Sequence, residues 1–325
     1  MGQISRCWCV GLTLLSGTCL VLTACQESTA TVAVPTTDAR SAPRRTATAS
    51  PATESPVTAS PAATGSRIAT TVGLQEGEVY GVGMPVTVDF STPIPDRAKA
   101  DVERRLSVRS DPPHDGAWRW YGDQQVIYRP KDLWRTGTTV TVSTALGGLP
   151  VAGGSVDTNR RVTARIGRKM TFQISDATKQ MRVFQNDKLI KTFPVSLGAP
   201  DTPSSSGNMV VMTREAEALW VYSADDQLDV KYAERLTADG EYIHAAPWSV
   251  ADQGRNDVSH GCTNLSNDNA AWVYDNSKVG DPVIVTGTAK HLAPGNGWTV
   301  WDMSWTDYIK GSALPQQTRP AATKR

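Results

Sequence analysis

One cysteine and two histidines carry the reactive side chains of this sequence. Cys262 lies in the motif SHGCTN (residues 259–264), and His244 lies upstream in the motif IHAAPWS (residues 243–249). A thiol becomes a strong nucleophile when it loses its proton, and a nearby imidazole can accept that proton and stabilise the thiolate as an ion pair. The pattern therefore indicates acyl transfer through a thioester on Cys262, with a histidine as the base.

The two histidines differ in their sequence surroundings. His244 is in an apparent strand, and we expect it to be the base. His260 is two residues before Cys262 in a tight turn, and we expect it to position that turn. No Asp or Glu stands next to either histidine, so the backbone carbonyl of Ala245 is the nearest candidate for the group that orients the base.

The turn around the cysteine supplies further candidates. Gly261 permits close approach of the backbone, and the amides of Gly261 and Cys262 are natural donors to an oxyanion. Asn264, two residues beyond the thiol, could hydrogen-bond substrate or hold the loop. These residues leave open whether water or an amine completes the reaction.

Residues 1–25 have the layout of a secretory leader. Arg6 is followed by an uncharged stretch from Cys7 to Cys25. The stretch ends in LTAC (residues 22–25), which resembles a bacterial lipobox, so we expect Cys25 to be lipidated and to anchor an exported protein to the outer face of the cell membrane. An uncleaved signal anchor is the alternative.

Export bears on the interpretation of Cys262. The other cysteines all lie in the leader, and exported proteins normally pair their thiols. A buried cysteine that acts as a small hydrophobic residue is the alternative. The polar neighbours of Cys262 favour an exposed turn that carries a reactive thiol.

Composition and periodicity divide the rest of the chain. Residues 26–66 are mostly Ala, Thr, Ser and Pro, which predicts a disordered tether. Residues 67–160 contain alternating runs at 85–90, 125–129 and 138–143 and predict a small β-sandwich with one helix over 96–106. We expect Trp118 and Trp120 to share a strand face in its core, and His114 to be a loop residue.

Residues 161–288 again predict a mostly β domain. Its strands are expected at 170–174, 181–184, 189–195 and 282–286, with a hairpin turn at Asn186-Asp187. A short helix is expected to open at Ser266 or Asn267, just after the cysteine motif. Residues 289–315 concentrate three tryptophans, which predict either a segment docked onto the protein or an aromatic platform for a sugar. Residues 316–325 are expected to be disordered.

The charges and motifs of the chain exclude several classes of function. The net charge is +1, which gives no basic field for nucleic acid. The sequence has no Gly-rich phosphate loop, no paired CxxC and no HExxH motif, so neither a cofactor nor a metal is expected.

Several motifs together closely resemble the L,D-transpeptidases of mycobacteria and related actinobacteria. They are HAAPWS (244–249), SHGCTNLS (259–266), NAAW (269–272), GDPV (280–283), PVSLG (194–198) and GVGMPVTV (81–88), with further matches at Thr202-Pro203, Gly207, Gly297-Trp298 and Trp301. The resemblance implies an immunoglobulin-like β-sandwich over 67–160, an L,D-transpeptidase catalytic domain over 161–288, and a C-terminal extension over 289–315.

The resemblance also implies an activity. It is the formation of 3→3 cross-links in peptidoglycan: Cys262 attacks a donor tetrapeptide stem, D-alanine leaves, and the side-chain amine of meso-diaminopimelate in an acceptor stem resolves the thioester. By the same matching, His244 takes the base position, and His260 and Gly261 fall on the turn of the family. The residues expected to contact substrate are Asp239, Gly240, Trp248 and Asn264, and carbapenems are expected to acylate Cys262.

The sequence departs from the family pattern at two places, and two other functions are compatible with it. The residue after the base is often serine in relatives but is Ala245 here, and the lid segment (212–232) is short, with Tyr222 and Tyr232 as candidate lid residues. A cysteine L,D-carboxypeptidase or other hydrolase would use the same residues with water as acceptor. A wall-binding lipoprotein with a silent thiol is the non-enzymatic alternative.

Overall fold

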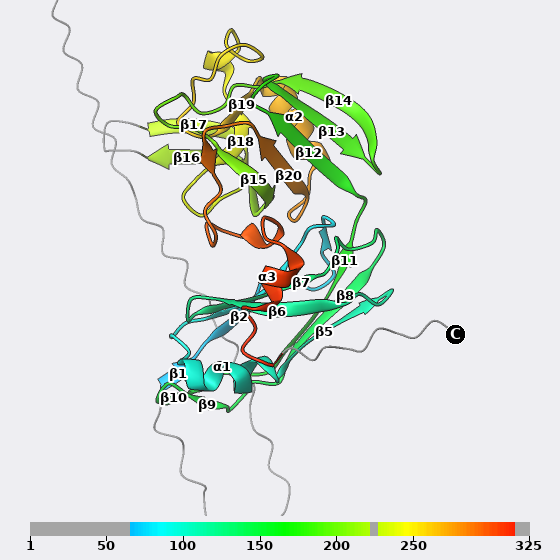
Figure 1. Ribbon diagram of the computed structural model, residues 1–325, viewed down its shortest axis with the longest axis vertical. Helices are drawn as coiled ribbons and strands as arrows, with labels where there is room; N and C mark the ends of the chain where they lie inside the picture. Colours follow the sequence, from blue (N-terminus) through cyan, green and yellow to red (C-terminus); the bar gives the residue numbers. More distant parts are fainter. Residues whose placement is uncertain (1–65, 222–226, 316–325) are drawn as a thin grey trace, which may run out of the picture. The chain divides into compact units, whose positions relative to one another are not determined.

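The computed structural model describes residues 66–221 and 227–315, apart from the side chain of Val221. These residues belong to one unit of the chain and are mostly β, as the sequence predicts (Figure 1). The leader with Cys25, residues 26–65 of the expected tether, Tyr222 and the tail 316–325 lie outside the described residues. None of the helices in the described ranges is long and apolar enough to cross a bilayer.

The first domain is a β-sandwich. One sheet has the order β2-β4-β7-β6 and contains β2 (Thr70–Val72), β4 (Val86–Phe90), β7 (Gln125–Pro130) and β6 (Gly116–Tyr121). The other has the order β3-β11-β8-β5 and contains β3 (Val79–Tyr80), β11 (Arg160–Ile166), β8 (Thr139–Thr144) and β5 (Leu106–Asp111). A small sheet joins β1 (Ser66–Ile68), β10 (Gly154–Val156) and β9 (Pro150–Val151), and α1 spans Asp96–Glu103.

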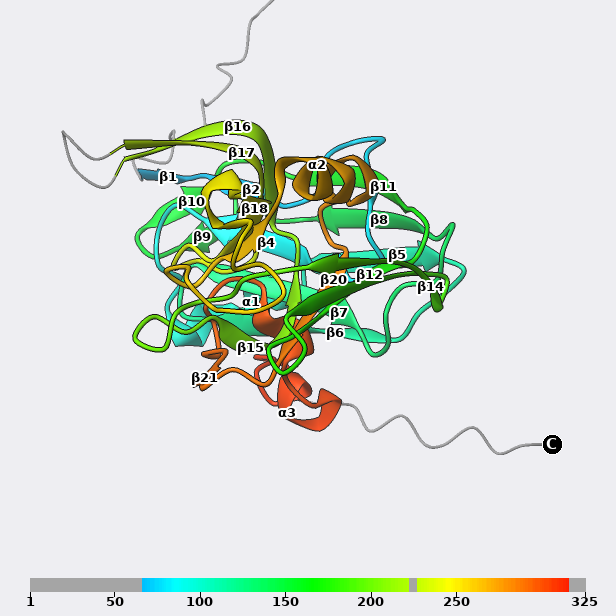
Figure 2. The ribbon, with the colours of Figure 1, turned by 90° about the horizontal axis from the view of Figure 1, so that it is seen from above.

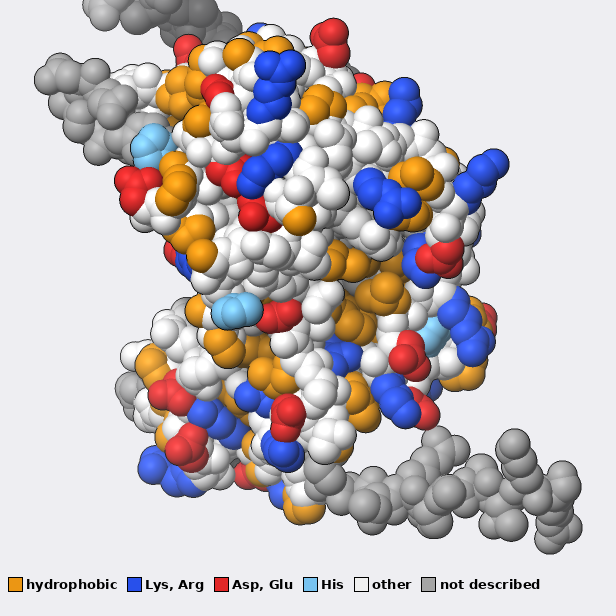
Figure 3. Space-filling view, turned by 45° about the horizontal axis from the view of Figure 1, so that its top comes forward, with side chains coloured by type: hydrophobic (Ala, Val, Ile, Leu, Met, Phe, Trp, Pro, Cys, Tyr) orange, Lys and Arg blue, Asp and Glu red, His pale blue; other side chains and the backbone are white. Residues whose placement is uncertain are grey.

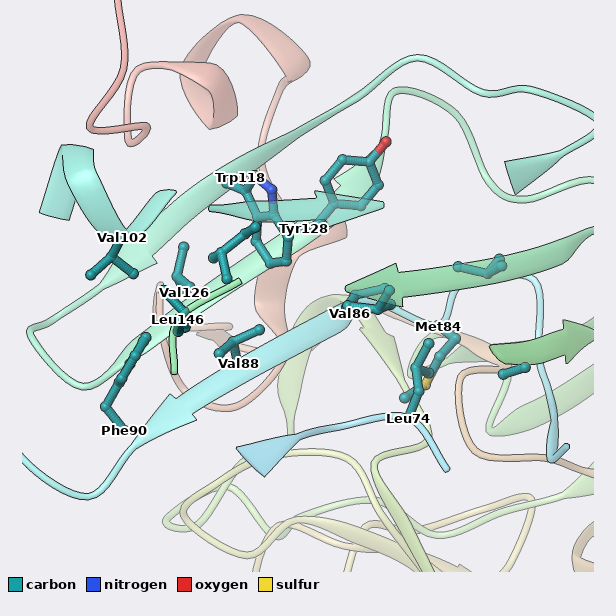
Figure 4. Close-up of a cluster of buried hydrophobic side chains, with 14 of the residues drawn as sticks. Leu74, Met84, Val86, Val88, Phe90, Val102, Trp118, Val126, Tyr128 and Leu146 are labelled. Atoms are coloured by element: carbon teal, nitrogen blue, oxygen red, sulfur yellow. The ribbon is translucent and has the colours of Figure 1, made fainter. Parts of the chain in front are cut away.

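Alternating apolar residues fill this sandwich. Val86, Val88 and Phe90 of β4 converge with Trp118 of β6 in the core (Figure 4). Trp120 stacks on Phe90 with ring centroids 5.9 Å apart, so both tryptophans of β6 pack where their spacing predicts. Each such buried side chain contributes about 1.5–3 kcal/mol relative to an exposed one.

The boundary between the domains lies later than residue 160. β11 pairs with β8 from Arg160 to Arg165 and with β3 at Arg165 and Ile166, so it is the last strand of the sandwich. The first strand of the second domain is β12 (Met170–Ser175). The correction arises because strand pairing, which depends on residues far apart in the sequence, decides where a domain ends.

The second domain has two sheets. The larger has the order β14-β13-β12-β20-β15-β21 and adds β14 (Lys188–Pro194), β13 (Gln180–Gln185), β20 (Pro282–Thr286), β15 (Ser205–Val210) and β21 (Lys290–His291) to β12. The smaller has the order β16-β17-β18-β19 and contains β16 (Thr213–Val221), β17 (Gln227–Arg235), β18 (Tyr242–Ala245) and β19 (Thr263–Leu265). In both Figure 1 and Figure 2, β16 and β17 run together and project from the body of the domain.

Local signals in the second domain behave as expected. The predicted turn joins β13 to β14, with Asn186 and Asp187 at φ of 48° and 65°, the left-handed region that such a hairpin turn requires. The helix after the cysteine is α2 (Asn267–Asn276), and the side chain of its N-cap Ser266 accepts a hydrogen bond from the Asn269 amide. A cap of this kind contributes about 1 kcal/mol.

The C-terminal segment (289–315) docks onto the sandwich. It contains β21, η2 (Thr299–Trp301) and α3 (Trp305–Ile309), and its tryptophans pack around Ile127 and Tyr308. The indole N–H of Trp301 donates to the carbonyl oxygen of Gly83 at 2.7 Å. The hydroxyl of Tyr308 donates to the carbonyl oxygen of Ile127 at 2.7 Å. These contacts favour a docked segment over a sugar platform.

Candidate active site

Two parallel strands place the cysteine and the histidine beside one another. β18 pairs with β19 so that His244 is opposite Asn264. Because side chains alternate along strands, Cys262, two residues before Asn264, falls on the same face as His244. Both side chains line one cavity of about 710 Å³, whose other described lining residues are Trp220, Gln227, Leu228, Trp248, Val258, Ser259, His260 and Asn264.

His244 is oriented by the backbone. Its side chain is 3% exposed, and Nδ1 lies 2.9 Å from the carbonyl oxygen of Ala245. Because a carbonyl only accepts, the neutral ring carries its proton on Nδ1 and leaves a lone pair on Nε2. Burial lowers the pKa of His244, and the contacts with the Ala245 carbonyl and the Asn264 side chain oppose that shift.

Asn264 is buried beside the imidazole. Its Nδ2 atom donates to Ser249 Oγ at 3.2 Å, while its Oδ1 atom has no hydrogen-bond partner in the described structure. That free oxygen would stabilise a proton on His244, in accord with the upward contribution of Asn264 to the pKa of the imidazole. Asn264 therefore faces the base.

The thiol of Cys262 is held between two backbone groups. Its Sγ atom donates to the carbonyl oxygen of Gly240 at 3.9 Å, and the N–H of Tyr242 also faces it. Burial raises the pKa of Cys262 to about 12, the Tyr242 N–H lowers that pKa, and the charge of Glu241 raises it further. A raised thiol pKa and a lowered imidazole pKa both favour the neutral forms of the two groups over a thiolate–imidazolium pair.

Ser259 organises the turn that carries the nucleophile. Its Oγ atom accepts from the Gly261 amide at 3.1 Å and donates to the Cys262 carbonyl at 2.7 Å. Gly261 has φ of +120°, which favours glycine. The expected positioning residue, His260, is instead exposed at the cavity. Because the Gly261 amide already has an acceptor, it is not a free oxyanion donor in this state.

Aromatic rings form the walls of the cavity around the base. Trp248 lies on η1 (Pro247–Ser249), is 56% exposed, and has its ring 6.1 Å from that of His244. Trp220 of β16 meets the imidazole edge to face at 5.0 Å and lies 4.8 Å from the ring of Tyr242. No local sequence signal marks Trp220, because only the pairing of β16 with β17 carries it to this site.

The remaining predicted residues occupy different positions. Gly240 contributes its carbonyl to the thiol, whereas the side chain of Asp239 accepts from Thr237 and lies 3.6 Å from Lys290. Tyr232, a candidate lid residue, instead packs against Tyr274 of α2, with tilted rings whose centroids are 5.8 Å apart, and against the domain core. It is therefore not part of the site.

The described lining of the cavity carries no Lys, Arg, Asp or Glu. On the face drawn in Figure 3, acidic and basic side chains are interspersed, with no extended field of one sign. Across residues 66–221 and 227–315, no three His, Cys, Asp or Glu side chains are grouped so that they could hold a metal ion. Within the same ranges, Cys262 is the free cysteine.

Comparisons with known families place two domain types on this chain. The family described as bacterial Ig domain matches residues 29–150, and the family described as L,D-transpeptidase catalytic domain matches residues 169–285. The second match begins just before β12, ends within β20, and includes every described residue that lines the cavity.

Individual proteins agree with these matches. The chain is similar to L,D-transpeptidase 2 of Mycobacterium tuberculosis, with 33% identity over 73% of this chain and 60% of that protein. It is 36% identical to L,D-transpeptidase 1 of the same species over 65% of this chain and 82% of that protein. The solved structure of LD transpeptidase LdtMt1 in complex with imipenem has a TM-score of 0.56 and 33% identity, covering 66% of this chain and 97% of that one.

Proposed function

Because the chain belongs to the L,D-transpeptidase family, we propose that it is a peptidoglycan L,D-transpeptidase that uses Cys262 as its nucleophile and His244 as its base. The observation that carries the assignment is the cavity that Cys262 and the backbone-oriented imidazole of His244 both line. The chain spans three fifths of the length of L,D-transpeptidase 2.

The acylation step follows from two neutral partners. As Sγ of Cys262 attacks the carbonyl at the L-centre of meso-diaminopimelate in the donor tetrapeptide, Nε2 of His244 takes the thiol proton. The tetrahedral intermediate collapses to a thioester. The proton on Nε2 passes to the departing D-alanine amine, and the free Oδ1 of Asn264 supports the transient imidazolium.

The second step transfers the acyl group from Cys262 to the acceptor stem. The side-chain amine of meso-diaminopimelate in the acceptor stem attacks the thioester carbonyl and forms the 3→3 amide bond. His244 accepts the amine proton and returns it to the sulfur, which leaves both side chains neutral for the next cycle. Replacement of the usual serine by Ala245 is compatible with this scheme, because the position acts through its carbonyl oxygen.

We further propose that substrate lies along the aromatic walls formed by Trp220 and Trp248, and that carbapenems acylate Cys262. The similar LdtMt1 was solved in complex with imipenem, which supports the second point.

From the sequence of the leader we propose export and lipidation at Cys25, so that the protein would act at the outer face of the cell membrane. Exchange of Cys25 for alanine would then release the protein from membranes.

Incubation of the protein with tetrapeptide stems tests the function, with Cys262→Ala as the control. Cross-linked dimers and free D-alanine that disappear in the variant are expected. Tripeptide without dimers would make the protein a hydrolase. If neither product forms and imipenem gives no adduct by intact-mass spectrometry, the protein is a wall-binding lipoprotein instead.

A further inference from the structure

Glu241 is a buried carboxylate directly behind the nucleophile. It is 7% exposed and lies between Gly240 and Tyr242, the two residues whose backbone groups face the thiol. Its Oε2 atom accepts from the Ser205 amide at 2.9 Å. Its Oε1 atom accepts from the Ser205 hydroxyl at 2.7 Å and from Lys290 Nζ at 2.8 Å. Its carboxylate therefore has donors on both oxygens.

The two peptide units that flank Glu241 have the same arrangement. In the first, the Gly240 carbonyl accepts from the thiol, and the Glu241 N–H donates to Thr237 Oγ1 at 2.9 Å. In the second, the Tyr242 N–H faces the thiol, and the Glu241 carbonyl accepts from the Leu236 amide at 2.9 Å. Each unit thus has one end at the sulfur and the other fixed to residues 236–237.

The same carboxylate also lies against the nucleophile turn. A Cβ atom at Gly261 would lie 3.6 Å from Cγ of Glu241, so the two segments are in van der Waals proximity. Ser204 donates to the Gly261 carbonyl at 2.7 Å, while its neighbour Ser205 binds Glu241. Two adjacent serines therefore hold both segments that surround the sulfur.

We propose that Glu241, paired with Lys290, is a positioning residue that directs the Gly240 carbonyl and the Tyr242 N–H at Sγ of Cys262. The Gly240 carbonyl holds the neutral thiol, and the Tyr242 N–H stabilises the thiolate character that develops during attack. Lys290 lies at the start of the C-terminal segment, so that segment contributes to the geometry of the nucleophile. The inference rests on the proposed role of Cys262 as nucleophile.

The charge of Glu241 and its hydrogen bonds have opposite expected effects on the reactivity of Cys262. The negative charge of Glu241 opposes formation of a thiolate, whereas its hydrogen bonds fix the groups that stabilise one. The charged and titratable groups near it are Lys290, which binds its carboxylate, Asp239, which lies 3.6 Å from Lys290, and Cys262 and Tyr242, with Arg235 over the tyrosine ring. A glutamine at 241 removes the charge and keeps a side chain that can bind Ser205, whereas an alanine removes both.

The experiment measures the rate at which iodoacetamide alkylates Cys262 from pH 6 to 10, by mass spectrometry of the peptide that contains it, and the rate of imipenem acylation. We expect Glu241→Gln to leave alkylation as fast as, or a few-fold faster than, in the wild type. We expect Glu241→Ala to slow both reactions about tenfold or more at every pH. Lys290→Met should slow alkylation across this pH range, because Glu241 then loses its counter-charge and its negative charge opposes the thiolate more strongly.

Matched controls separate these effects from general destabilisation. Lys310→Met removes an exposed lysine of the same C-terminal segment and should change neither rate. Ser205→Ala, which removes one donor to Glu241, should slow acylation in the same direction as Glu241→Ala even if the latter variant does not fold. If Glu241→Ala or Ser205→Ala reacts as fast as Glu241→Gln, the positioning role is overturned. Absence of cross-linked product from the wild type, with these alkylation shifts intact, would refute the proposed function alone.

Discussion

The Nδ1 atom of His244 lies 2.9 Å from the carbonyl oxygen of Ala245, the next residue in the chain. This contact fixes both the plane and the tautomer of the ring without an acidic partner. An acidic partner would have raised the pKa of the imidazole, whereas here burial lowers it. The neutral ring is therefore ready to accept a proton from a neutral thiol at the moment of attack.

Loss of His244 should slow acylation far more than loss of His260. His244→Ala removes the proton acceptor, and general-base catalysis typically contributes about 10²–10⁴-fold. His260 is exposed, so His260→Ala should change the rate less than tenfold. Stopped-flow measurement of imipenem acylation at pH 7 checks both variants. A larger loss in His260→Ala would exchange the two roles.

Ser259→Ala should impair the nucleophile turn. The change removes the hydrogen bonds to the Gly261 amide and the Cys262 carbonyl, each of which contributes about 1 kcal/mol. We expect slower acylation by about tenfold and a lower melting temperature. Ser266→Ala, which removes the N-cap of α2, should lower the melting temperature similarly but leave the acylation rate near that of the wild type. Equal acylation by the two variants would contradict the assignment of Ser259.

Trp220→Ala should weaken substrate binding more than chemistry. The indole covers one side of the imidazole and forms a wall of the cavity, so its loss removes apolar contact area from any bound acyl donor. We expect the half-saturating imipenem concentration to rise about tenfold with a smaller change in the limiting acylation rate. Trp305→Ala, in the cluster of the C-terminal segment, is the control and should leave that concentration unchanged. A selective fall of the limiting rate would mean that Trp220 orients the base instead.

Asp281→Asn should stabilise the protein at alkaline pH. Asp281 is 1% exposed, its Oδ2 atom accepts from the Lys278 amide, and burial raises its pKa to about 8. Because this folded-state pKa lies above the unfolded value, the contribution to stability is present at acidic pH and is lost as the pH rises towards 8. The asparagine resembles the protonated acid at every pH.

The measurement for Asp281 is the melting temperature of both proteins between pH 4.5 and 8.5. The variant should melt higher than the wild type at pH 8.5, by an amount that corresponds to about 1–3 kcal/mol, and the difference should shrink towards pH 4.5. Glu234, whose pKa burial raises to about 7, is present in both proteins, and its negative charge contributes to the raised pKa of Asp281. A constant difference across the range would show that Asp281 does not titrate there.

Local sequence signals explain what could be predicted of this fold. The turn at Asn186 and Asp187 and the cap at Ser266 depend on residues that are adjacent in sequence, and both occur where expected. The cysteine and histidine motifs likewise carry the candidate nucleophile and base within short segments.

The contributions of Trp220, Ser259 and Glu241 had weaker signals. Trp220 reaches the imidazole only because β16 pairs with β17, and Glu241 reaches Lys290 only because β21 pairs with β15. Ser259 is part of the cysteine motif, but the motif alone favours its neighbour His260 as the positioning residue, because His260 has the more reactive side chain. The sequence also does not reveal how deeply Cys262 and His244 are buried, and that burial raises the pKa of the thiol and lowers the pKa of the imidazole.

The docking of residues 289–315 has a practical consequence for work with isolated catalytic fragments. A fragment that ends near Thr286 would lack Lys290, and it would also lose the Asn296 side chain, which accepts from the Asp239 amide at 3.0 Å. Its thiol could then report a reactivity that the intact enzyme does not have. Inhibitor rankings obtained on such a fragment should be compared with those of the longer chain before they guide chemistry.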